Sequence, residues 1–335
     1  MTHVARTLRT VTGIALAPDI DSLDLSNRFR LPRTPQSQAL SRIPQTVALG
    51  FEQAMTATTI GQLHTRLSLM RSEHLGFAYE GATMASTITD LARPGRSRWT
   101  VQVMSGPGSA HLFLNYIGIG FAMARLPRAA WPNVLPPLPA SSYHPALSWL
   151  AVDGCGFDWA FFDPARWITR QEVPDPYPWL GEDPAFFPHV IDQGIGRALW
   201  FVAAGDLPTV TGLVTSFPTH RHLDLWSGVG LAATFAGGVH NGDLRQIRGQ
   251  ARLEAGIGAA LAAKARHTAG LVPEHTAVAA ARLTGLNVEH LVQVVDSFDP
   301  TVRETGTPVY RAWRDHIRSA LSDSASDRRP DSVPA

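Results

Sequence analysis

The 335-residue chain has one cysteine, Cys155, and one lysine, Lys264, among its 29 basic residues. A single cysteine excludes an internal disulfide and is usual for proteins of reducing compartments. Charged residues make up only 17% of the chain and the net charge is +1, so the composition does not point to nucleic acid as a partner. The composition predicts a globular protein with a large core.

Long hydrophobic runs are also lacking. The longest strongly apolar stretch lies at 112–124, well short of the roughly 18 residues that span a bilayer. The apolar part of the N-terminus, "VTGIALA", is at the lower limit for a signal peptide and contains threonine and glycine. We therefore expect a cytoplasmic protein without a transmembrane segment.

Alternation of the kind found in β-strands is almost absent. Only "RWTVQVM" at 98–104 suggests a strand, whereas residues 36–71 repeat apolar side chains every three or four positions. Proline-rich stretches at 127–145 and 173–188 break the helical pattern. We predict a mainly α protein with an irregular lead-in at 1–34, one all-α repeat domain at 35–320 and a disordered tail at 321–335.

An internal repeat organises this chain. Gly-x-Gly followed by an apolar stretch begins at Gly118, Gly154, Gly194, Gly228 and Gly256, with a looser copy around Gly81. A glycine inside a helix costs about 1 kcal/mol relative to alanine, so these glycines predict places where helices approach closely. The steps of 28 to 40 residues suit helix pairs. The expected architecture is a helical-repeat array or α/α toroid-like domain with one central cavity.

The repeat argues against several tempting motifs. "GVGLAA" at 228–233 matches a dinucleotide fingerprint, but it follows no strand and has near-copies elsewhere. Cys155 occupies a slot that the other copies fill with isoleucine or valine, so we interpret it as a core residue. His220 and His222 point to different helix faces and suggest no metal site. We therefore expect neither a cofactor nor a metal ion.

Polar residues that break the repeat are the candidate functional residues. Arg197 and Asp158 occupy slots that the other copies keep apolar or small, and Asp192 precedes one motif by two residues. The residue directly before the first glycine is Glu80, Asp153, Gln193 or Ser227 in different copies. A polar group in such a slot needs a partner or a ligand. The alternative is that Asp153, Asp158, Asp192 and Arg197 only cap helices or pair with each other.

Our hypothesis for the site assigns roles to these residues. Asp153, Glu80 and Asp192 are the candidate acid–base groups, with Arg197, Asp158, Gln193 and Ser227 as substrate-binding groups. Six of the nine tryptophans lie within residues 149–226, and Trp159, Trp200 and Trp226 are expected to form part of an apolar pocket wall.

Four blocks of the sequence resemble the UnbL family, known also as domain of unknown function 1702. They are "GFAYEGATMA" (76–85), "LAVDGCGFDWAFF" (150–162), "DQGIGRALWFV" (192–202) and "DLWSGVGLAATFAGG" (224–238), extended by "AAKAR" (262–266) and "HT" (275–276). The resemblance implies a place in gene clusters for enediynes and related natural products, beside an integral membrane protein of the UnbU type and a repeat protein of the UnbV type. It implies no catalytic residues. It also implies that relatives have histidine at the position that Asp158 occupies here.

Two functions are compatible with these observations. One is an enzyme that binds an extended apolar or polyene intermediate and promotes its cyclisation or rearrangement by acid–base chemistry. The other is a non-catalytic carrier or scaffold that holds an intermediate or docks pathway partners on a concave helical surface.

Overall fold

Apolar stretches separated by proline-rich or glycine-rich connections fold as helices throughout the part of the chain that the structure describes. This structure is a computed structural model, which describes residues 20–92, 98–138 and 146–326. Its α-helices are α2 (Leu25–Phe29), α3 (Pro35–Thr56), α4 (Ile60–Leu67), α5 (Leu75–Ala92), α6 (Trp99–Met104), α7 (Leu112–Arg125), α8 (Trp149–Phe162), α9 (Phe187–Val202), α10 (Leu207–Ser216), α11 (His222–Ala236), α12 (Gly249–Thr268), α13 (Glu274–Thr284), α14 (Val288–Asp296) and α15 (Val309–Ser326). Over these ranges β pairing is limited to one isolated bridge. The prediction of a mainly α fold is confirmed.

Of the one strand candidate at 98–104, residues 99–104 form helix α6 instead. The carboxylate of Asp90, at the end of α5, accepts hydrogen bonds from the main-chain N–H groups of Trp99 (3.1 Å) and Thr100 (2.9 Å). A carboxylate that satisfies the free N–H groups of a first turn stabilises the helix there. This tertiary contact overrides the alternating pattern of a six-residue segment.

The ends of the chain differ in detail from the expected boundaries. Helix α2 lies within the lead-in, and α15 extends to Ser326, past the expected start of the tail. Helix α3 begins at Pro35. There the Thr34 hydroxyl accepts a hydrogen bond from the main-chain N–H of Ser37, and the Ser37 hydroxyl accepts one from the main-chain N–H of Thr34. Such a capping box fixes the start of the helix. Residues 1–19 and 327–335 lie outside the described ranges.

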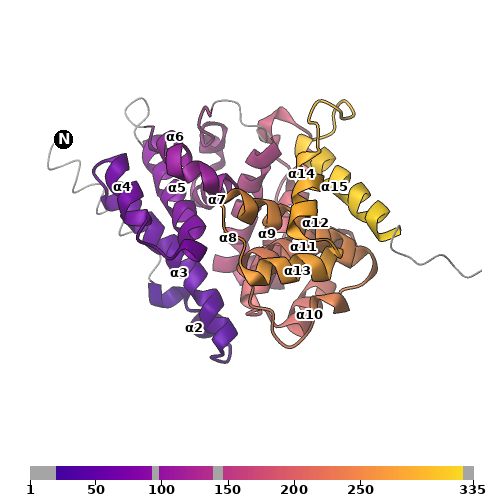
Figure 1. Cartoon of the computed structure of the whole chain (residues 1–335). Coiled ribbons are helices and arrows are strands. Elements are labelled where there is room, and N and C mark those ends of the chain that lie inside the picture. The colour runs from indigo at the N-terminus through magenta and orange to yellow at the C-terminus, as the bar shows by residue number, and fades with distance from the viewer. Residues whose placement is uncertain (1–19, 93–97, 139–145, 327–335) are drawn as a thin grey trace, which may run out of the picture.

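Seven helices form a row in the order α3, α5, α7, α8, α9, α11, α12, each packed against the next. Figure 1 shows this order running from α3 and α5 on one side of the molecule to α11 and α12 on the other. Neighbours in the row are antiparallel. On α5 and α7, for example, Glu80 lies against Gly118 while Thr83 binds Asn115 at 3.0 Å, so the numbers rise on one helix and fall on the other.

The neighbours cross at glycines that leave no room for a side chain. A Cβ atom at Gly118, Gly154, Gly194 or Gly228 would lie within 1.9–2.4 Å of a main-chain oxygen of the preceding helix in the row. The next glycine of each motif makes the same contact with the following helix, as where a Cβ on Gly230 would lie 1.9 Å from the Ala255 oxygen. The glycines therefore mark close helix crossings, and overpacking there has a steric cost.

The packing corrects the sequence-based repeat at two points. Gly258, and not Gly256, meets Ser227 on α11, while Gly256 faces the side chains of Leu321 and Thr284. The last step of the repeat is therefore 30 residues (228 to 258) rather than 28. The repeating unit is also no uniform helix pair. Between consecutive helices of the row, α4, α6 and α10 are the inserted α-helices, and the remaining connections hold only short 3-10 or π turns and irregular segments.

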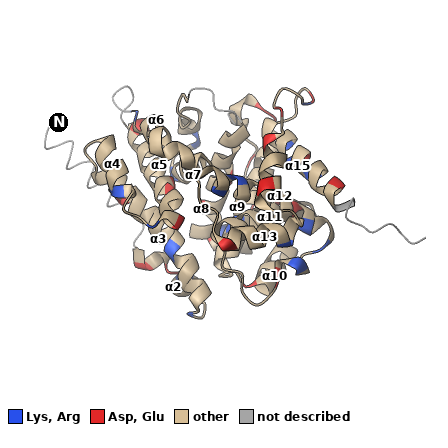
Figure 2. Ribbon diagram, viewed as in Figure 1, with Lys and Arg blue, Asp and Glu red and all other residues tan. Residues whose placement is uncertain are grey.

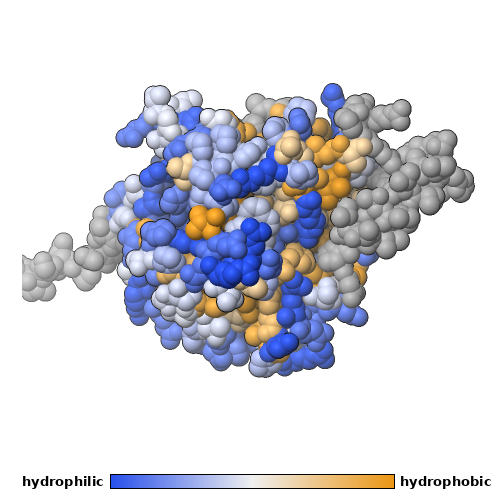
Figure 3. Space-filling model, turned by 180° about the vertical axis from the view of Figure 1, so that it is seen from behind, coloured by the Kyte–Doolittle hydropathy of each residue, from blue (hydrophilic) through white to orange (hydrophobic). Residues whose placement is uncertain are grey.

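The remaining helices cover the ends and sides of this row. Helices α13, α14 and α15 pack on α12, and α2 packs on α3 and α9. Charged residues are sparse along the ribbon (Figure 2), as the low charged fraction predicts. On the face shown in Figure 3, hydrophilic residues cover most of the surface, and hydrophobic residues gather beside the atoms drawn in grey. None of the described helices is both long and apolar enough to cross a membrane.

Candidate functional site

One side chain from each helix of the row points into a shared interior. On each helix from α5 onward, we call the residue three places after the glycine that meets the preceding helix the inner position. On α3, Gly50 meets the following helix, so Ala48, two places earlier, is the equivalent of that glycine. The seven inner positions are Phe51, Met84, Phe121, Phe157, Arg197, Leu231 and Leu261. All seven line one of two adjoining cavities. Six are apolar, and Arg197 is the one charged side chain among them.

The two cavities have volumes of about 60 and 30 Å³. They share four lining residues, Phe77, Glu80, Arg197 and Phe201, and therefore meet at the acid and the arginine. Phenylalanines dominate the wall of the larger cavity, where the rings of Phe157 and Phe161 are stacked with centroids 5.5 Å apart. The site is a narrow, mostly aromatic space, and Glu80 and Arg197 lie at its centre.

Glu80 is the acid at this centre, and it is 2% exposed. Among the described residues it has no hydrogen-bond partner and forms no ion pair. Burial raises its pKa from 4.5 to about 8; Arg197 opposes the rise and Asp153 adds to it. At neutral pH Glu80 is therefore a protonated acid, a state that can donate a proton to a bound molecule.

Arg197 is held in place from behind by Asp153. Its guanidinium forms an ion pair with this fully buried carboxylate on the neighbouring helix α8. It also lies over the ring of Phe157, with 4.9 Å from the guanidinium carbon to the ring centroid. An arginine has five N–H donors in a rigid fork, and one of its amino groups is directed at Asp153. The side chain also lines both cavities, where it presents positive charge to an occupant.

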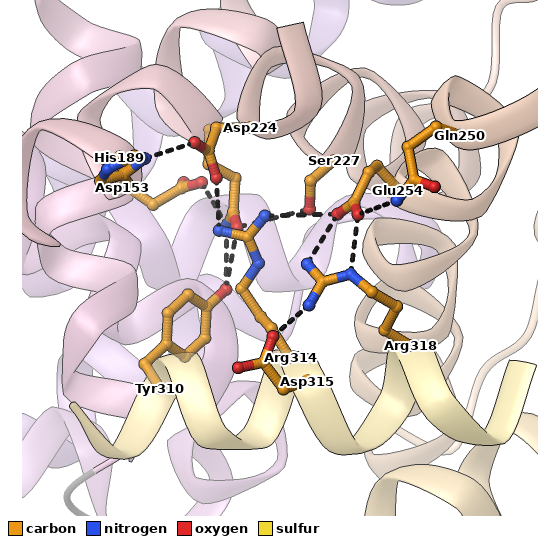
Figure 4. A network of polar contacts seen from close by, with 11 residues as sticks. Asp153, His189, Asp224, Ser227, Gln250, Glu254, Tyr310, Arg314, Asp315 and Arg318 are labelled. Atoms are coloured by element: carbon orange, nitrogen blue, oxygen red, sulfur yellow. Dashed lines mark hydrogen bonds and ion pairs between the residues drawn. The ribbon is translucent and has the colours of Figure 1, made fainter. Parts of the chain in front are cut away.

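Asp153 belongs to a polar network that reaches the C-terminal helix (Figure 4). The amide nitrogen of Gln193 donates to Asp153 (2.8 Å) and to the hydroxyl of Tyr310 on α15 (2.9 Å). The Ser227 hydroxyl reaches the Gln193 oxygen at 3.5 Å. Asp153, Gln193 and Ser227 are fully buried and are not among the residues lining the two cavities. They support Arg197 from the side away from the cavities.

Further along α15, the network continues into a set of ion pairs. Arg314 donates to Asp224 (2.8 Å), which also binds His189 at 2.8 Å, and Arg318 donates to Glu254 at 2.7 Å. Figure 4 shows Tyr310, Arg314 and Arg318 projecting from one face of α15 toward these partners. Tyr310 and Arg314 carry no signal in the sequence, because α15 lies outside the repeat. Nothing in their local sequence marks them as partners of helices 90 or more residues earlier.

Asp158 lies at the wall of the larger cavity and forms an ion pair with Arg125. Burial raises the pKa of Asp158, and Arg125 opposes this rise. Arg28 reaches the same corner, where it donates to the main-chain oxygens of Phe161 (3.0 Å) and Phe162 (3.2 Å). Arg125 and Phe162 are partly exposed, so this corner connects the cavity to the surface.

Other residues of the hypothesis lie away from the two cavities. Asp192 faces Arg221, whose Nε donates to it at 2.9 Å. Trp200 donates to the Gly237 oxygen at 2.8 Å, and Trp159 stacks on Trp167 with centroids 4.5 Å apart. Neither these tryptophans nor Trp226 line the cavities. Phenylalanines take the place expected for tryptophan. Of the pairing among the four charged residues considered from the sequence, Asp153 with Arg197 occurs, whereas Asp158 and Asp192 pair with Arg125 and Arg221, which the sequence did not single out.

Cys155 is fully buried, and burial raises the pKa of its thiol well above the usual value. Such a thiol is a poor nucleophile, since the thiolate is the reactive form. Among the described residues, no group of three or more histidine, cysteine, aspartate or glutamate side chains is arranged to hold a metal ion.

The model of one protein family, described as "Protein of unknown function (DUF1702)", matches residues 7–321. The chain belongs to this family. The match includes all seven helices of the row and both cavities. No curated protein matches the chain, and no solved structure matches it. The candidate site therefore has to be interpreted from its own chemistry.

Proposed function

We propose that this protein is an enzyme that moves protons on an extended, apolar, conjugated molecule bound in the row's interior. The proposed outcome is a cyclisation or rearrangement of that molecule. The observation that carries the proposal is the position of Glu80. It is a buried acid without a partner among the described residues, at the meeting point of two phenylalanine-lined cavities and beside a fixed arginine.

The acid strength of Glu80 favours one class of substrate. A carboxylic acid with a pKa near 8 is too weak to protonate an isolated alkene efficiently, but it suits proton transfer near neutral pH. Carbons conjugated to a carbonyl group exchange protons far more readily. We therefore infer a polyene whose double bonds are conjugated to a carbonyl oxygen.

In the proposed step, the carboxylate form of Glu80 first removes a proton from a carbon next to the conjugated system. Arg197 holds the carbonyl oxygen, where its positive charge stabilises the negative charge of the enolate that forms. Glu80, now protonated, then donates the proton to another carbon of the conjugated system, which restores the carboxylate. Proton loss and gain balance, so the product is an isomer of the substrate. If ring closure occurs, two carbons of the polyene form the new bond.

The apolar wall supports a hydrocarbon occupant. Seven phenylalanines line the larger cavity: Phe51, Phe77, Phe121, Phe157, Phe161, Phe162 and Phe201. Their rings offer apolar surface and electron-rich faces for a polyene. A cavity of about 60 Å³ is small for an extended polyene, so such an occupant has to displace some of these rings.

The biological setting is also a proposal. The resemblance of the motif blocks to the UnbL family supports a role in natural-product clusters of the enediyne type, with UnbU-type and UnbV-type proteins as pathway partners. We further propose a cytoplasmic location, and that the row of helices acts as a toroid-like array around its occupant. The antiparallel crossings and the shared interior of the seven inner positions support this arrangement.

A deletion strain tests the function. Removing the gene should cause one conjugated precursor to accumulate, and the purified protein should convert that precursor into an isomer of equal mass. Glu80→Gln should bind the precursor but lower its turnover about 100-fold or more, since a positioned general acid contributes about that much. Glu289→Gln, at an exposed site on α14, is the matched control and should convert it normally. If wild-type protein binds the precursor and releases it unchanged, the protein is a carrier and the enzymatic proposal is wrong.

A further inference from the structure

A third cavity continues the two described above. Its volume is about 230 Å³, and it shares Phe113, Leu114, Phe235 and Ala265 with the smaller inner cavity. Ser72 and Gly270, on its lining, are exposed. The three cavities therefore adjoin in sequence, from the surface near Gly270 to the centre at Glu80 and on to the corner at Arg125.

Arg266 is the strongly basic group of this outer cavity. It lies on α12, belongs to the "AAKAR" block, and is 5% exposed. One guanidinium nitrogen donates to the main-chain oxygen of Glu73 (2.9 Å) and another to that of Phe235 (2.6 Å). The guanidinium carbon lies 3.9 Å from the centroid of the Phe235 ring. Two helix segments and one aromatic face thus fix the side chain against the cavity.

No carboxylate of the described residues forms an ion pair with this buried cation, and the Glu73 carboxylate acts on it only from a greater distance. That carboxylate pairs with Arg71 (2.7 Å) instead. The Nε of Arg266 is buried and has no hydrogen-bond partner there. His111, on the same wall, adds no negative charge. A buried cation without an ion-pair partner is costly, and an anion in the cavity would relieve that cost.

We propose that Arg266 binds the terminal carboxylate of an extended apolar chain, which runs from the outer cavity inward to Glu80. The inference rests on the proposed function and names the substrate class: a long-chain carboxylic acid whose polyene also carries the separate carbonyl group that Arg197 holds. Two residues mark the path along α12, Arg266 in the outer cavity and Leu261 at the inner position. They are five residues apart, which is about 7.5 Å along the helix axis. Phe113, Leu114 and Phe235 form the apolar wall between the two ends.

The probe for this inference is cis-parinaric acid, a conjugated fatty acid whose fluorescence rises in apolar surroundings. Titrations compare the acid with its methyl ester, which has the same chain without the charge. Wild-type protein should bind the acid about tenfold or more tightly than the ester, since a charge-assisted bidentate contact is lost with the ester. Arg266→Met should abolish this preference without weakening ester binding. Arg266→Lys should restore part of it, since lysine keeps the charge and loses the fork.

Ester binding shows that each variant is folded, and Arg245→Met, which removes an arginine side chain that is 64% exposed, is the matched control. Equal affinity of wild-type protein for acid and ester, or a preserved preference in Arg266→Met, would overturn the inference. If the preference disappears only in Arg197→Met, the carboxylate binds at the centre. That result contradicts the role of Arg266 and leaves the function of Glu80 standing. Loss of the preference in Arg266→Met together with normal turnover in Glu80→Gln would contradict only the proposed function.

Discussion

Arg197 on α9 and Asp153 on α8 form an ion pair across a helix crossing at which Gly194 allows the two backbones to touch. Asp153 is fully buried and Arg197 lines the cavities, so the pair connects the hidden polar network to the site. The aspartate balances the charge of the pair as a whole and fixes the position of the arginine. The guanidinium is the member of the pair that lines the cavities, and it lies beside Glu80.

Removing one member of this pair should destabilise the protein more than removing both. Asp153→Asn leaves a buried guanidinium without its counter-charge, which costs about 3–5 kcal/mol of unfolding free energy. The double variant Asp153→Asn with Arg197→Met should recover a large part of that loss, because no unpaired charge remains. Urea unfolding of the wild type, both single variants and the double variant measures the coupling. Additive effects would mean that the two groups do not act as a pair.

Glu80 should make stability depend on pH. Its pKa in the folded protein, about 8, lies above its ordinary value of 4.5, so the folded state holds the proton more tightly. The stabilisation is complete below pH 4.5 and is lost as the pH rises to 8. Relative to Glu80→Gln, the wild type should lose about 3 kcal/mol between pH 5.5 and pH 8.5, at about 1.4 kcal/mol per pH unit. Parallel stability curves for the two proteins would show that Glu80 titrates normally.

The crossing glycines should tolerate not even one methyl group. A Cβ at Gly230 would lie 1.9 Å from the Ala255 oxygen, so Gly230→Ala should destabilise the protein by about 2 kcal/mol or more. Gly196→Ala, whose Cβ would lie 2.0 Å from the Leu225 oxygen, should behave alike. Gly212, on α10, has open space around its Cβ position, and its replacement by alanine is the control. If thermal unfolding gave Gly212→Ala a lower melting temperature than the other two variants, the close-packing account would be contradicted.

Cys155 should be inert in the folded protein. Because its thiol is fully buried and its pKa is raised, a thiol reagent such as DTNB should react only as fast as the protein unfolds. Cys155→Val should keep full ligand binding, since branched aliphatic residues occupy this slot in the other copies of the motif. Rapid labelling of native protein, with loss of binding, would identify the thiol as a functional group.

The repeat made part of this site predictable. Arg197 could be singled out because it is charged in a slot that other copies keep apolar, and the crossings place that slot on a common interior. Glu80 could be singled out because it directly precedes a crossing glycine, although its polar counterparts Asp153, Gln193 and Ser227 lie away from the cavities. Which glycine of α12 meets the preceding helix could not be predicted, since Gly256 and Gly258 fit the pattern of the sequence equally well. Only the contact of Gly258 with Ser227 decides between them.

Contacts between distant segments were beyond the sequence. Arg266 binds the main-chain oxygen of Glu73, 193 residues earlier, and no local pattern records that pairing. Tyr310 reaches Gln193 from a helix outside the repeat, for the same reason. The pocket wall was expected from the density of tryptophans, yet aromatic content does not tell which face of a helix each ring occupies. Trp159, for example, stacks on Trp167 away from the cavities.

The most direct test of the central claim is the titration of Glu80 itself. Protein labelled with ¹³C at the glutamate side-chain carboxyl carbons is followed by NMR from pH 5 to pH 9, and Glu80→Gln identifies the resonance by its disappearance. The account predicts a carboxyl group that is protonated at pH 7 and titrates with a midpoint near 8. A Glu80 resonance that titrates near 4.5 would show an ionised carboxylate at neutral pH, and would contradict its role as the proton donor of the cavity.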